Sequence, residues 1–96
     1  MTFESNQQFW DAITTTAKKL EQIGLERESK SLQGALCCSS STTEIFGEVG
    51  ITLAPLTVDA QLPGDLREEI SEEFETIVKI LPGMNRYRPT SAERIN

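Results

Sequence analysis

Apolar side chains recur along this chain at the three- and four-residue steps of an α-helix. The first stripe consists of Phe9, Ile13, Ala17 and Leu20. Side chains at these steps share one helix face, which a globular domain buries. Ser5 and Gln8 have the spacing of a capping box, and Gly24 suits a left-handed helix end. The pattern predicts a helix from about residue 5 to residue 23.

Two further stripes follow that turn, separated by a polar run. The second stripe consists of Leu25, Leu32, Ala35 and Leu36. The serines and threonines at 39–43 end it, because such side chains compete for backbone hydrogen bonds. Within that run, Ser41 and Glu44 repeat the capping-box spacing and begin the next helix. The third stripe consists of Ile45, Phe46, Val49 and Leu53.

The third predicted helix contains two glycines, and its sequence also fits an extended segment. Gly47 and Gly50 each weaken a helix by about 1 kcal/mol relative to alanine, a cost that close approach of a neighbouring helix would explain. Residues 49–58 are rich in Val, Ile and Thr, so a short extended segment is an open alternative. Pro55 ends or kinks whatever precedes it.

The fourth stripe is the most regular in the chain. After a connection at residues 55–62, Pro63 suits the first turn of a helix, and Pro82 with Gly83 ends it. The stripe consists of Leu66, Ile70, Phe74, Ile77 and Leu81. Because the connections are short, successive helices must be neighbours that run in opposite directions. The predicted fold is therefore all-α, a compact antiparallel bundle of about four helices with a basic C-terminal tail.

The tail differs from the rest in composition. Residues 84–96 hold three arginines (Arg86, Arg88 and Arg94) and one glutamate (Glu93), a local net charge of +2. We therefore divide the chain into a helical domain at 1–83 and a tail at 84–96. The tail is either flexible or laid across the acidic body, where its arginines could pair with the fourth helix.

The overall charge points to a class of partner. Nine basic and fifteen acidic side chains give a formal net charge of −6 over 96 residues. Phosphate binding needs clustered Lys and Arg, so nucleic acid and anionic membrane are poor partners and a basic protein is favoured. Plain solubility is the alternative explanation of the charge. The N-terminus lacks the pattern of a secretory signal and no apolar run could span a membrane, so we expect a cytoplasmic protein.

Few residues offer chemistry. The chain has no histidine, which excludes Ser-His-Asp and Cys-His nucleophilic sites and removes the commonest general base. We expect no enzyme activity, no catalytic residues and no cofactor. Cys37 and Cys38 are adjacent, and we interpret one as a small core residue and the other as a boundary residue rather than as a redox or metal site.

The fourth helix supplies the candidate binding residues. We expect its carboxylates to lie opposite the apolar stripe, in solvent, with only Arg67 and Lys79 to offset them. The predicted acidic docking surface consists of Glu68, Glu69, Glu72, Glu73 and Glu75. Trp10, beside the first stripe, is a candidate interface anchor, although core packing is an alternative role. A hard-metal site is less favoured, because it needs inward-facing carboxylates from more than one helix.

These observations lead to two main functional hypotheses. In size, charge and lack of catalytic groups the chain resembles toxin-immunity and antitoxin proteins, although it shares no motif with them. The first hypothesis is a small acidic domain that neutralises or inhibits a basic partner enzyme by binding it. The alternative is a helical adaptor or regulatory module that acts as a homodimer, with residues 49–58 as a dimer face.

Overall fold

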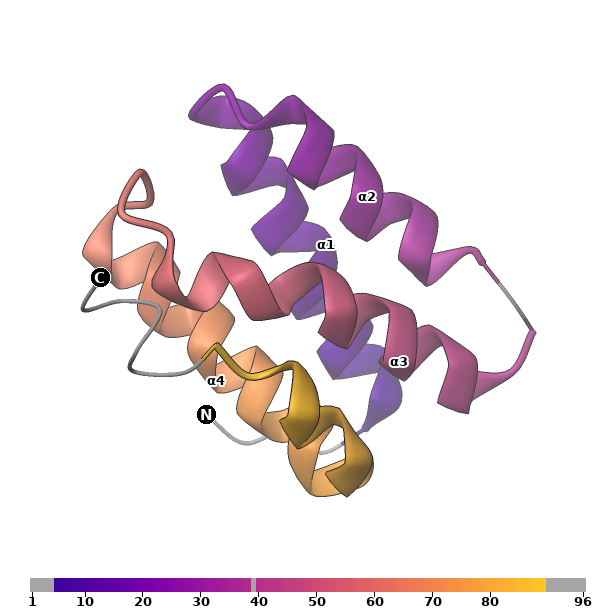
Figure 1. The fold of residues 1–96 in the computed structure, drawn as a ribbon. Helices are drawn as coiled ribbons and strands as arrows, with labels where there is room; N and C mark the ends of the chain where they lie inside the picture. Colours follow the sequence, from indigo (N-terminus) through magenta and orange to yellow (C-terminus); the bar gives the residue numbers. More distant parts are fainter. Residues whose placement is uncertain (1–4, 39, 90–96) are drawn as a thin grey trace.

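The computed structural model describes residues 5–38 and 40–89, and these residues form helices joined by short turns (Figure 1). The elements are α1 (Asn6–Gln22), α2 (Glu26–Leu36), α3 (Thr42–Leu53), the 3-10 helix η1 (Ala54–Val58), α4 (Gly64–Ile80) and the 3-10 helix η2 (Pro82–Tyr87). No strand occurs among the described residues. The prediction of an all-α bundle of about four helices is confirmed.

Two of the helices, α1 and α3, begin where a serine side chain satisfies a free backbone N–H. The Ser5 hydroxyl accepts a hydrogen bond from the Gln8 N–H at 3.2 Å, and the Ser41 hydroxyl accepts one from the Glu44 N–H at 3.5 Å. Both predicted caps are therefore present. Gly24 has a φ angle of 90°, which allows the chain to turn sharply between α1 and α2.

The core lies where the four apolar stripes meet. Phe9 of α1, Leu32 of α2, Phe46 of α3 and Phe74 of α4 are all buried. In Figure 1, α1 lies alongside α2, and it also contacts α4 at the other side of the bundle. The indole of Trp10 is partly buried and packs on the Phe46 ring, with 4.6 Å between the ring centroids.

Residues 49–58 are helical, so the extended alternative is wrong for this segment. The α3 helix continues to Leu53 and passes directly into η1. Close packing explains the glycine at position 50. A β-carbon there would lie 2.7 Å from Met84 Cε and 3.2 Å from Ile77 Cγ2. The expected close approach therefore occurs at Gly50. It does not occur at Gly47, where a β-carbon would meet nothing within 4 Å.

The first part of the C-terminal tail packs on the body. Met84 of η2 is buried, and the Arg88 guanidinium pairs with Glu75 of α4. Of the two alternatives considered for the tail, contact with the fourth helix is the one that Arg88 makes. Glu93 and Arg94 lie outside the described residues.

The two cysteines are not core residues. Cys37 and Cys38 are both exposed and free, so the prediction that one packs in the core is wrong. The reason is that α2 ends at Leu36, and Ala35 and Leu36 are the last side chains of that helix to face the core. In the described part of the chain, no helix has both the length and the apolar character that crossing a membrane requires.

Candidate functional site

The predicted docking carboxylates on α4 occupy three different environments. Glu68, Glu72 and Glu75 are exposed, as expected. Glu69 is half-buried. Glu73 is only 1% exposed, so its placement in solvent is wrong. The acidic surface is therefore smaller than the sequence suggested.

The position of Glu73 follows from the helical period. It comes seven residues after Leu66 and four before Ile77, so it lies within the apolar arc of α4. Thr16 has the matching position on α1, three residues after Ile13. Both side chains consequently face the interface between the two helices. The spacing in the sequence could have revealed that each of these side chains is buried.

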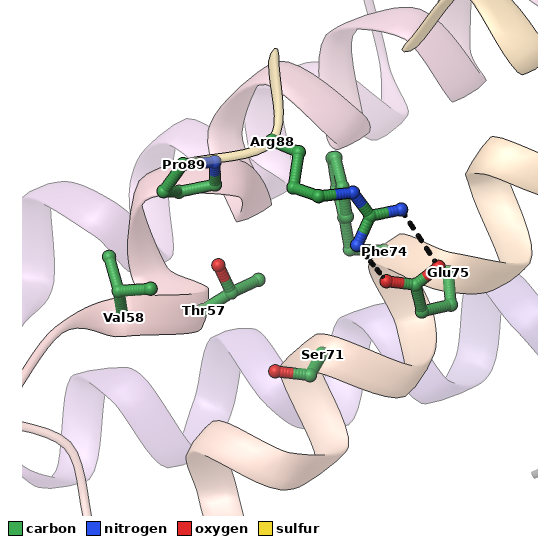
Figure 2. Close-up of a pocket in the computed structure, with 7 residues that line it drawn as sticks. All are labelled: Thr57, Val58, Ser71, Phe74, Glu75, Arg88 and Pro89. Atoms are coloured by element: carbon green, nitrogen blue, oxygen red, sulfur yellow. Dashed lines mark hydrogen bonds and ion pairs between the residues drawn. The ribbon is translucent and has the colours of Figure 1, made fainter. Parts of the chain in front are cut away.

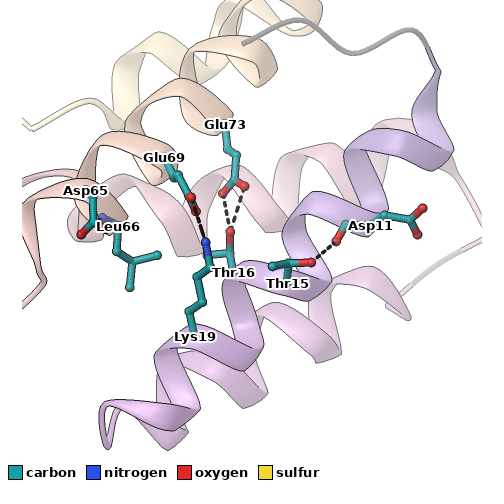
Figure 3. Close-up of polar contacts among 8 residues, drawn as sticks. All are labelled: Asp11, Thr15, Thr16, Lys19, Asp65, Leu66, Glu69 and Glu73. Atoms are coloured by element: carbon teal, nitrogen blue, oxygen red, sulfur yellow. Dashed lines mark hydrogen bonds and ion pairs between the residues drawn. The ribbon is translucent and has the colours of Figure 1, made fainter.

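Glu73 and Thr16 meet inside that interface (Figure 3). The Thr16 hydroxyl donates a hydrogen bond to the Glu73 carboxyl group, at 2.8 Å from Oε2 and 3.1 Å from Oε1. Burial raises the pKa of Glu73 to about 8, and it outweighs the opposing effects of the Thr16 hydrogen bond and the Lys19 charge. At neutral pH this side chain is mainly a neutral acid. It links α1 to α4 and does not attract a basic partner.

One helical turn away, Lys19 of α1 neutralises Glu69. The ammonium lies 2.8 Å from Oε1 and 3.0 Å from Oε2 of Glu69. The hydrogen bond to Glu69 raises the pKa of Lys19. The expectation that only Arg67 and Lys79 offset the α4 carboxylates is thus wrong. The Arg67 guanidinium instead donates to the backbone carbonyl of Asp59 at 3.2 Å.

Glu75 also has a partner, the Arg88 guanidinium (Figure 2). Two terminal nitrogens of Arg88 reach the two carboxylate oxygens, and the contact between Nη2 and Oε1 measures 3.0 Å. The hydrogen bond from Arg88 lowers the pKa of Glu75. The same guanidinium lies over the Phe74 ring, 5.6 Å from its centroid.

A shallow depression of about 360 Å³ remains on the outer side of α4. It is lined by Glu68, Ser71, Glu72, Glu75, Thr76 and Lys79. We call the three carboxylates of this depression, Glu68, Glu72 and Glu75, the acidic face. Against these three carboxylates stand Lys79, which lines the depression, and Arg88, which pairs with Glu75, so the surface keeps a net negative charge. Trp10 is not part of it, because its ring packs on Phe9 and Phe46.

No group of three Cys, Asp or Glu side chains within residues 5–38 and 40–89 is placed to hold a metal ion. The arrangement on α4 can attract cations and donate or accept hydrogen bonds at a surface.

No protein-family model, no curated protein and no solved structure matches this chain.

Proposed function

We propose that this chain is a protein-binding domain whose acidic face docks a basic protein and neutralises it. The observation that carries the proposal is the depression on α4, where three carboxylates and one ammonium line an exposed surface. Glu69 is paired with Lys19, Glu73 is buried and Glu75 is paired with Arg88, so Glu68 and Glu72 supply most of the exposed negative charge at this place. If the partner is an enzyme, a domain seated over its basic substrate site would exclude the substrate.

The acidic face suits rapid encounter with such a partner. Glu68 and Glu72 are one turn apart, and like charges at this spacing destabilise a helix by a few tenths of a kcal/mol. A basic partner relieves that repulsion and is steered by the field of the whole molecule, whose net charge is −6. The apolar side of α4 is held in the core, so the face is presented on a rigid element.

The homodimer alternative receives less support from the segment first assigned to it. Within residues 49–58, the apolar side chains of Val49, Leu53, Ala54 and Leu56 are buried in the core. Ile51 remains exposed at 42%. A dimer formed through this segment would have little apolar surface to bury.

Affinity capture from a native lysate tests the proposal. Tagged wild-type protein should retain a basic protein in near-stoichiometric amount and release it at raised salt, because exposed charges are screened. Glu68→Lys with Glu72→Lys should weaken this capture by roughly tenfold or more, since both changes reverse charges of the acidic face.

The matched control is Glu21→Lys with Glu48→Lys, which changes the net charge equally at exposed sites on α1 and α3. It should retain the partner. Equal loss in both double variants would mean that only net charge matters and would contradict a defined docking face. Capture of the chain itself, without another protein, would favour the adaptor alternative.

A further inference from the structure

One of the chain's own arginines, Arg88, pairs with Glu75 at the end of the acidic face. A cavity of about 180 Å³ lies between η1, α4 and the segment after η2 (Figure 2). Its lining residues are Thr57, Val58, Ser71, Phe74, Glu75, Arg88 and Pro89, so Arg88 itself forms part of the wall. The Arg88 side chain extends from the C-terminal segment toward Glu75 (Figure 2). The cavity shares Ser71 with the lining of the depression, and Glu75 as well, so the two surfaces are continuous.

The contacts of Arg88 are those that distinguish arginine from lysine. Its planar fork binds both oxygens of Glu75, and its guanidinium lies over an aromatic ring at 5.6 Å. A lysine ammonium is a point charge and cannot form the paired contact. The geometry of the site is therefore selective for one type of cation.

Arg88 is held in a way that permits its release. The side chains of Arg88 and Glu75 are 41% and 49% exposed, and exposed ion pairs contribute little to stability. Met84 anchors η2 in the core beside Gly50, so η2 can stay docked while the arginine leaves. Besides its contacts with Glu75 and Phe74, the Arg88 side chain donates a hydrogen bond from Nε to Asn85 Oδ1 at 2.8 Å.

We propose, resting on the function proposed above, that Glu75 and Phe74, at the wall of this cavity, form an arginine-recognition site of the acidic face and that Arg88 occupies this site as an intramolecular competitor. An arginine side chain of the partner displaces Arg88, binds Glu75 through the same fork and lies over Phe74. The partner is thus a protein that presents arginine, rather than lysine, at its binding surface. The tail regulates the site by lowering its apparent affinity.

Binding of labelled nona-arginine and nona-lysine peptides, followed by fluorescence anisotropy, tests this inference. Arg88→Ala should bind nona-arginine about three- to fivefold more tightly than wild type, because the competing pair is worth little and its loss frees the site. Arg86→Ala is the matched control. It removes the same charge two residues away, from a side chain that contacts Tyr87 and not Glu75. Adding Glu75→Gln to Arg88→Ala should abolish the gain.

Selectivity is the second measurement. Arg88→Ala should bind nona-arginine more tightly than Arg86→Ala does, whereas the two variants should bind nona-lysine with equal affinity. An equal gain for both peptides, or equal affinities of the two alanine variants for nona-arginine, would overturn the inference. Neither result would affect the proposed function, which depends on capture through Glu68 and Glu72. Circular dichroism of each variant confirms that the helices are intact.

Discussion

Among single residues, Glu73 has the most unusual environment. Its carboxyl group is almost completely buried, and a threonine hydroxyl is its hydrogen-bond partner. A buried charge without a cationic partner in contact is costly, so the neutral form predominates at physiological pH. Glu73 therefore behaves as a polar contact between helices and is lost as a contributor to the negative surface.

This environment makes stability depend on pH. The folded pKa of Glu73 is about 8, against 4.5 for an ordinary glutamate. Between these values the folded state holds a proton that the unfolded state has released, so stability falls as pH rises. We expect a loss of a few kcal/mol in the free energy of unfolding from pH 4.5 to pH 8, at about 1.4 kcal/mol per pKa unit.

Glu73→Gln isolates this effect, because the amide keeps the size and the hydrogen bond but does not ionise. Urea denaturation of both proteins from pH 5 to pH 8.5 should show the variant gaining stability relative to wild type as pH rises. Titration of all other groups cancels in the difference. A difference that stays constant across this range would mean that Glu73 is not protonated in the folded protein.

Among the helices, the interface of α1 with α4 shows which features a sequence pattern predicts and which it does not. The helical period predicts which side of each helix is buried, and the stripes of α1 and α4 are confirmed. Thr16 is 57 residues from Glu73, and Lys19 is 50 residues from Glu69. Periodicity within one helix does not say which helix will lie opposite or at what rotation. Those two pairings were therefore beyond prediction, whereas the burial of Glu73 was readable from its spacing.

In the tail, too, some contacts could be predicted from the sequence and others depend on tertiary packing. Opposite charge made contact between its arginines and the fourth helix one of two alternatives, and Arg88 makes this contact. The position of that guanidinium over Phe74 depends on the path of η2, which Met84 sets by packing beside Gly50. No local pattern in residues 84–89 indicates this packing. The candidate site was thus predicted in its charge and its helix, but not in its cavity.

The two glycines of α3 provide a test at the scale of this helix. Gly47→Ala should stabilise the protein by up to about 1 kcal/mol, because its new methyl group meets nothing and alanine favours the helix. Gly50→Ala should be less favourable than Gly47→Ala by about 1–3 kcal/mol, since its methyl group would crowd Met84 and Ile77. Chemical denaturation measures both. Equal effects would show that α3 and η2 do not approach closely at Gly50.

For the molecule as a whole, the small amount of exposed apolar surface disfavours self-association. Among the described residues, the exposed large apolar side chains are Ile23, Ile51, Ile80 and Tyr87, each 38–46% exposed. A stable interface buries about 800 Å² on each partner, more than these side chains supply. Net negative charge adds repulsion between copies.

We therefore expect the reduced protein to remain monomeric at concentrations of roughly 100 μM, where weak dimers of small interface area dissociate. Sedimentation velocity over a hundredfold range of concentration measures this. A sedimentation coefficient that rises with concentration under reducing conditions would contradict the expectation and would favour the homodimeric adaptor.

The adjacent exposed thiols of Cys37 and Cys38 affect the handling of such a protein. Surface thiols that face solvent can be oxidised by dissolved air, and disulfides between different molecules would then join chains end to end through the α2–α3 turn. A covalent pair formed during storage would imitate a biological dimer on a non-denaturing column. The same position gives an attachment point for a maleimide dye away from the acidic face, so partner binding can be followed without labelling α4.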